Sequence, residues 1–175
     1  MISRRVLVCL GIFVASGLAG CSGGEDVTVR SLANARRIWD AAKVRDYNLE
    51  WTSSGERDSH YRVYVRGGEV KSVRQFLDDR RENKIREVEA KTADPSYFGV
   101  DGLFKILEEE RAQLLSDEPF GKPKGTSVLL KFTPDRELGF PRRYRRDVVG
   151  STRGMAIDVI SFVPNPPAAI PALAP

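Results

Sequence analysis

The sequence predicts an α+β domain in which an antiparallel β-sheet of about five to six strands carries two helices packed on one face. Two observations support this fold class. Apolar residues recur at helical spacing in two separate stretches, and after each stretch they alternate with polar residues in short segments. The resulting order is helix, three strands, helix, three strands. Segregated helices and strands of this kind are typical of α+β domains with helices on one side of an antiparallel sheet.

The first twenty residues have the parts of an export signal. Arg4 and Arg5 precede an apolar run over residues 6–19, which is shorter than the ~20 residues that an apolar helix needs to cross a bilayer. The tetrapeptide Leu18-Ala19-Gly20-Cys21 resembles the lipobox of bacterial lipoproteins. That resemblance implies cleavage before Cys21 and acylation of its thiol. The alternative is an ordinary secretory signal with a chance cysteine.

The expected boundaries follow from this N-terminus and from composition. We expect a lipoprotein signal peptide over 1–20, a flexible tether over 21–29, a single α+β domain over 30–163 and a disordered Pro/Ala-rich tail over 164–175. The other cysteine, Cys9, lies inside the signal, so the mature domain has no disulfide. Ser22, at the position after the acylated cysteine, favours the outer membrane by similarity to enteric bacteria.

The first helix is predicted from Ser31 to about Val44. Ser31 is the expected N-cap, because its hydroxyl can accept a hydrogen bond from a free amide of the first turn. An apolar stripe recurs every three or four residues, and Trp39 within it is expected in the core rather than on a ligand-binding surface.

A β-hairpin is predicted around Gly67-Gly68, because glycines tolerate the positive φ angles of a two-residue turn. This turn predicts that Arg66 faces Glu69, Val65 faces Val70 and Tyr64 faces Lys71. Another strand is predicted before this hairpin, around Tyr47–Trp51. The charged stretch over 78–91 fits either a solvated helix or an edge strand with a mobile loop.

A second amphipathic helix is predicted from Val100 to Leu115, with Asp101 as its cap. Strands then follow around Val128–Phe132 and Met155–Val163. Between them, the segment Arg142-Arg143-Tyr144-Arg145-Arg146 has charged residues on both faces. A central strand would bury arginines at a high cost, so we expect an edge strand or an exposed ribbon here.

Composition excludes several classes of function. Residues 1–20 carry Arg4 and Arg5 and no acid, so cleavage lowers the formal net charge from +4 to +2, too little for a nucleic-acid binder. His60 is the one histidine and is expected at the surface, which leaves no His/Cys metal site. The sequence has no Walker, Gly-x-Ser-x-Gly or His-Glu-x-x-His motif, so we expect no cofactor, no metal and no enzymatic activity.

Four segments resemble the DUF6174 family of bacterial lipoproteins, whose function is unknown. They cover residues 39–47, 63–70, 100–107 and 132–142, and the resemblance spans roughly 36–163. Thr133 stands where the family has an acid, the following turn has an extra residue, and the 78–99 region is longer. The resemblance implies the fold and an exported, lipid-anchored protein, and it supplies no catalytic residues.

Two functional hypotheses follow, with a purely structural envelope role as a third. The first is a lipid-anchored binding module of the cell envelope, on the periplasmic side or at the surface of the outer membrane. It would bind a protein partner or an anionic component through Arg142, Arg143, Tyr144, Arg145 and Arg146, since guanidinium groups bind carboxylates and phosphates bidentately. The alternative is that these arginines only make a strand edge soluble and prevent aggregation. The second hypothesis is an envelope hydrolase that uses two converging carboxylates.

Overall fold

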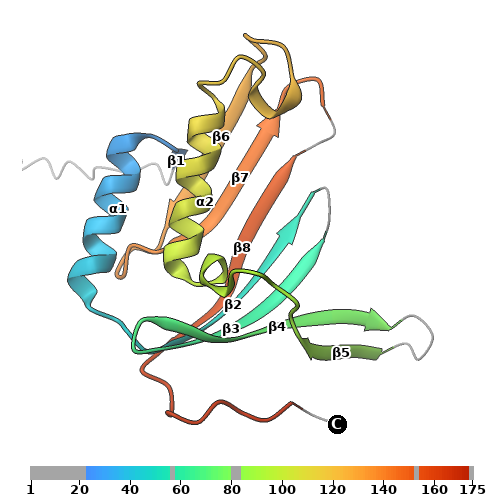
Figure 1. Ribbon diagram of the computed structural model, residues 1–175. Coiled ribbons are helices and arrows are strands. Elements are labelled where there is room, and N and C mark those ends of the chain that lie inside the picture. Colours follow the sequence, from blue (N-terminus) through green and yellow to red (C-terminus); the bar gives the residue numbers. More distant parts are fainter. Residues whose placement is uncertain (1–22, 56–57, 80–83, 152–153, 174–175) are drawn as a thin grey trace, which may run out of the picture.

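The computed structural model describes residues 23–55, 58–79, 84–151 and 154–173, and within them it confirms the α+β class. An open antiparallel sheet of eight strands, in the order β1-β6-β7-β8-β2-β3-β4-β5, carries helices α1 and α2 (Figure 1). The elements are β1 (Glu25–Asp26), α1 (Val29–Ala42), β2 (Tyr47–Ser54), β3 (Ser59–Arg66), β4 (Glu69–Asp79), β5 (Lys84–Glu89), α2 (Val100–Gln113), β6 (Val128–Pro134), β7 (Pro141–Val148) and β8 (Met155–Pro164). Short 3-10 turns lie at Pro95–Phe98 and Pro119–Gly121.

The sheet has more strands than the five to six expected, because two strands lie in segments without an apolar alternation. Strand β1 falls inside the expected tether: Asp26 lies opposite Lys131 of β6 and forms a 2.8 Å ion pair with it. The next residue, Val27, is buried and donates its N–H to the Leu130 carbonyl. Residues 25–29 are therefore part of the domain. Strand β5 lies in the charged stretch over 78–91, for which an edge strand was one of the two predicted alternatives. Residues 80–83 of that stretch lie outside the described residues.

Helix α1 begins earlier than expected. Its N-cap is Thr28, whose hydroxyl accepts from the Ser31 N–H at 3.0 Å, while the Ser31 hydroxyl accepts from the Thr28 N–H at 2.9 Å. Ser31 is thus the third helical residue of a capping box, which satisfies two free donors rather than one. The prediction of Ser31 as N-cap was wrong by three residues, since two hydroxyl residues with the same capping potential stand that far apart.

Both helices pack on the same face of the sheet (Figure 1). Trp39 of α1 is buried as expected, edge-on to the rings of Tyr47, Phe140 and Phe162 at 5.6–6.3 Å between centroids. From α2, Leu103 and Leu107 pack on Pro141, Tyr144 and Ile157. The two helices are linked by a 2.7 Å hydrogen bond from Arg36 to Asp101. No helix of the described residues lies on the opposite face of the sheet, which is called the open face below.

The start of α2 is capped from the sheet. Gly99 is its N-cap residue and has no side chain that could accept a hydrogen bond from the first turn. The buried Tyr47 hydroxyl accepts the Val100 N–H instead, at 2.9 Å. Burial raises the pKa of Tyr47 to about 12, so the phenol remains neutral in this position. Asp101, expected as the cap, lies in the first turn, and Leu115 lies beyond the helix with 79% of its surface exposed.

The β3–β4 hairpin confirms two of the three predicted pairs. Arg66 lies opposite Glu69 and Val65 opposite Val70. Tyr64 lies opposite Ser72 instead of Lys71, because a bulge follows the turn. Within this bulge Lys71 forms an ion pair with Glu69, and the Arg66 guanidinium donates to the Tyr47 carbonyl.

No helix among the described residues is long and apolar enough to cross a membrane. The signal peptide and Cys21, the predicted lipid attachment site, lie outside the described residues.

Candidate functional site

Strand β7, which carries the predicted arginine cluster, lies inside the sheet between β6 and β8 (Figure 1). The prediction of an edge or exposed ribbon was therefore wrong. Alternation along the strand divides its charges between the two faces, and each buried or half-buried arginine has an acidic partner from another element. Such partners offset much of the cost of placing charge in an interior strand.

On the open face, Arg143 and Arg145 converge on one carboxylate. Arg143 Nε donates to Asp158 Oδ1 at 2.8 Å, and Arg145 Nη2 donates to Oδ2 at 2.7 Å. Burial alone would raise the pKa of Asp158, and the hydrogen bonds and charges of the two arginines outweigh it and lower the pKa below its ordinary value. Asp158 is thus an ionised acceptor, held between two cations.

An open hollow of about 920 Å³ lies beside this pair. Four arginines contribute to its lining: Arg136 from the β6–β7 turn and Arg142, Arg143 and Arg145 from β7. Arg136 and Arg142 are exposed, and neither has a hydrogen-bond or ion-pair partner among the described residues. We call the hollow that these four arginines line the arginine hollow.

Three acids also line the hollow: Asp135, Glu137 and Asp158. Asp135 Oδ1 accepts the N–H groups of Glu137 and Leu138, at 3.0 and 2.9 Å, and so closes the β6–β7 turn. The described residues contain no group of three or more His, Cys, Asp or Glu that could hold a metal ion. Arg136 and Arg142 present unpaired guanidinium groups at the hollow, and Asp158 is ionised and hydrogen-bonded to two arginines. Guanidinium groups in this arrangement are suited to binding a carboxylate or phosphate.

Tyr144 and Arg146, the other predicted site residues, point to the helix face. Arg146 Nη1 donates to both carboxylate oxygens of Glu110 on α2, at 2.7 and 2.9 Å, and the Tyr144 hydroxyl donates to the same group at 2.7 Å. Burial and the Glu110 charge raise the pKa of Tyr144 far above its ordinary value. The Arg146 guanidinium also lies 4.6 Å from the centroid of the Phe120 ring. These contacts join α2 to the sheet, so the structure does not bring Tyr144 and Arg146 to the arginine hollow.

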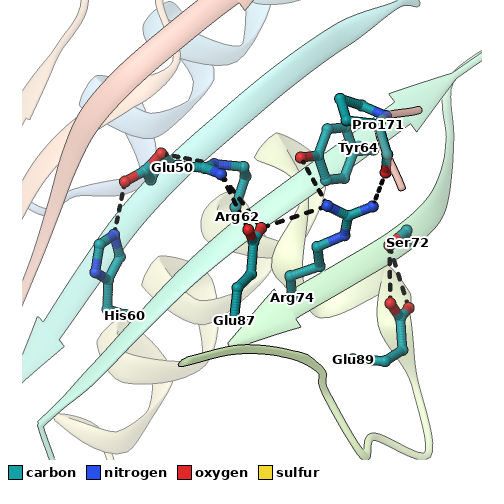
Figure 2. Close-up of polar contacts among 9 residues, drawn as sticks. All are labelled: Glu50, His60, Arg62, Tyr64, Ser72, Arg74, Glu87, Glu89 and Pro171. Carbon is teal, nitrogen blue, oxygen red and sulfur yellow. Dashed lines mark hydrogen bonds and ion pairs between the residues drawn. The ribbon is translucent and has the colours of Figure 1, made fainter. Parts of the chain in front are cut away.

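A chain of alternating charges crosses the open face over β2–β5 (Figure 2). Glu50 accepts from His60 at 2.7 Å and from Arg62 at 2.9 Å, and Glu87 then bridges Arg62 and Arg74. His60 was expected simply at the surface. Its ring is instead stacked on Phe76 at 4.0 Å and bound to Glu50, because period-two alternation places these residues on one face in adjacent strands.

Sequence reasoning missed Arg136 and Asp158 as members of the candidate site. Residues 143 and 145 share one face of a strand by alternation alone. Finding Asp158 also required the β7–β8 pairing, which places it directly opposite Arg143.

No known protein-family model matches the chain, and no curated protein matches it. The resemblance to the DUF6174 family therefore rests on the four segments described above.

Proposed function

We propose that this protein is a bacterial lipoprotein, anchored to an envelope membrane by lipid on Cys21, whose domain binds an anionic envelope component at the arginine hollow. The lipobox and the resemblance to DUF6174 lipoproteins support the anchor. The component presents carboxylate or phosphate groups, and its source is a lipid headgroup, an envelope polymer or an acidic segment of a protein. Binding is non-enzymatic in this proposal.

The observation that carries the binding proposal is the pair of exposed, unpartnered guanidinium groups of Arg136 and Arg142 in the hollow. Arg143 and Arg145 add positive charge behind them, and the four arginines of the lining outnumber its three acids, Asp135, Glu137 and Asp158. An anion at the rim would approach Arg136 and Arg142 directly and would be oriented by bidentate hydrogen bonds, which arginine forms with planar or tetrahedral oxyanions.

The anchor is tested by replacing Cys21 with alanine and fractionating cells that express the full chain. Wild-type protein should sediment with membranes and incorporate radiolabelled palmitate. The C21A variant should incorporate no palmitate, because it lacks the thiol that is acylated. Label in the variant equal to that in the wild type would contradict lipid anchoring at this residue.

The binding site is tested by in-cell crosslinking of the acylated protein, followed by separate analysis of captured proteins, lipids and polymers. The double variant R136E/R142E should lose at least 90% of the captured component, because two attractive charges become repulsive. The matched control is R30E/R37E on α1, which changes the net charge equally at exposed positions that have no partner among the described residues.

The three analyses distinguish the sources of the anion. A crosslinked species that survives in R136E/R142E, or that disappears equally in R30E/R37E, would reject the arginine hollow as its site.

A further inference from the structure

The segment after β8, which was expected to be disordered, follows the open face of β3 and β4. Its path begins where the Asn165 N–H donates to the Asp46 carbonyl at 2.8 Å. Arg66 then donates to the carbonyls of Pro167 and Ala168, at 2.9 and 3.4 Å. Arg74 Nη2 donates to the Pro171 carbonyl, as Figure 2 shows. Both arginines therefore bind the segment through its main chain.

The groups that receive this segment are held in place by the domain itself. Arg66 Nη1 donates to the Tyr47 carbonyl and to Asn48 Oδ1, at 3.2 and 3.0 Å. The Arg74 guanidinium lies 4.8 Å from the centroid of the Tyr64 ring, and its Nη1 lies 3.5 Å from Glu87 Oε1. Preorganised donors of this kind lose little conformational entropy when they bind a ligand. We call Tyr64, Arg66 and Arg74 the carbonyl-binding strip.

The geometry of the strip matches an extended proline-rich chain. Proline has no N–H, and polyproline II has no internal hydrogen bonds, so all its carbonyls are free to accept. From residue 167 to residue 171 such a chain spans about 12 Å. Arg74 pairs with Arg62, four residues from Arg66 along β3, a distance of about 13 Å along a strand. The spacing of the arginines therefore fits the spacing of the carbonyls.

We propose that the carbonyl-binding strip is a binding site for proline-rich, extended segments of a partner protein, and that residues 165–173 occupy it as an intramolecular ligand. The strip contacts main-chain carbonyls rather than particular side chains, so a partner segment of similar conformation can replace the tail. The buried Arg74 Nε has no acceptor when the tail is bound. A segment that supplies this acceptor makes one more hydrogen bond than the tail does.

This site is separate from the arginine hollow and does not depend on it. The tail competes at the high effective concentration of a tethered ligand, so a partner binds the intact chain weakly until the tail is displaced. A partner must therefore outcompete the tail in order to bind the strip.

The first measurement is paramagnetic relaxation in the acylated, full-length protein in detergent micelles. A spin label on Cys in an A172C variant should broaden the amide signals of Tyr64 and Ser72. The amides of α1, on the other face of the sheet, serve as the internal reference. Unchanged signals at Tyr64 and Ser72 would show that the tail does not occupy the strip, which would overturn the proposal.

The second measurement is an NMR titration with a synthetic peptide of residues 164–175. A chain that ends at Pro164 retains every strand, and it should bind the peptide at least tenfold more tightly than the intact chain does, with shifts at residues 64, 66 and 74. The full-length variant P166G/P167G/P171G, which loosens the tail without shortening it, should show the same gain and replaces the truncated chain if that chain unfolds.

Adding R74Q should abolish these shifts, whereas R37Q on α1 should not. Absence of shifts with several millimolar peptide would show that the tail is a fixed part of the domain and not an exchangeable ligand. Equal binding with and without R74Q would show that the peptide binds outside the strip. Either result would overturn the proposal.

Discussion

Replacing Glu110 with alanine should lower the free energy of unfolding by about 3–5 kcal/mol, because it removes one member of a buried ion pair and leaves the other charge uncompensated. Glu110 and Arg146 have side-chain exposures of only 14% and 12%. The same substitution removes the acceptor of the buried Tyr144 hydroxyl, and an unsatisfied buried donor adds to the loss. Urea denaturation followed by circular dichroism measures this change. Domains of this size are stable by about 5–15 kcal/mol, so the variant should be close to unfolding.

Two further variants distinguish the loss of the Glu110–Arg146 ion pair from the general effect of a substitution in α2. Glu108 is exposed on the same helix, and E108A should change the stability by less than about 0.5 kcal/mol. The double variant E110L/R146M replaces the pair with apolar side chains and should recover most of the loss, as replacement of buried ion pairs often does. If E110A lowers the free energy of unfolding no more than E108A does, the Glu110–Arg146 ion pair is not buried in solution.

The elements that were predicted correctly depend on local pattern. The helix around Trp39, the second helix from Val100 and the hairpin at Gly67-Gly68 each have their periodicity or turn residues within a short stretch of sequence. The α+β class follows from their order. Strand β1 was missed because two residues cannot show an alternation. For β5 the sequence left a solvated helix and an edge strand open, because most of its residues are charged and its apolar members Ile85 and Val88 are too few to show a period.

The arginine cluster was misassigned because its partners are distant in the sequence. Four arginines within five residues suggest an unpaired cationic surface when they are considered alone. Asp158 and Glu110, which neutralise three of them on opposite faces, lie 13 to 36 residues away and belong to other elements. A local pattern specifies which residues share a face, whereas the strand order and the helix packing decide whether their charges are compensated. Only Arg142 of the four keeps a free guanidinium among the described residues.

The second large effect is expected at Gly139, in the turn between β6 and β7. Its φ of +78° is one that L side chains rarely adopt, and a Cβ atom there would lie 2.4 Å from the Ala35 carbonyl oxygen and 2.8 Å from Ile38 Cβ. Both neighbours belong to α1. The Ala35 carbonyl and the Ile38 Cβ are fixed to the helix backbone, so neither can move without displacing the helix from the sheet. The turn itself is fixed by the bond from Asp135 N–H to the Phe140 carbonyl at 2.7 Å.

We therefore expect G139A to lower the free energy of unfolding by about 2–5 kcal/mol, the sum of backbone strain and overpacking. The chain offers a matched control in Gly150, whose φ is +74° and whose Cβ would meet nothing within 4 Å. G150A should cost only the backbone strain, about 1–2 kcal/mol. The difference between the two variants in urea denaturation measures the contact between the turn and α1. Equal losses would mean that α1 does not lie against this turn. A larger loss in G139A would establish the close approach that positions α1, and with it Trp39, over the sheet.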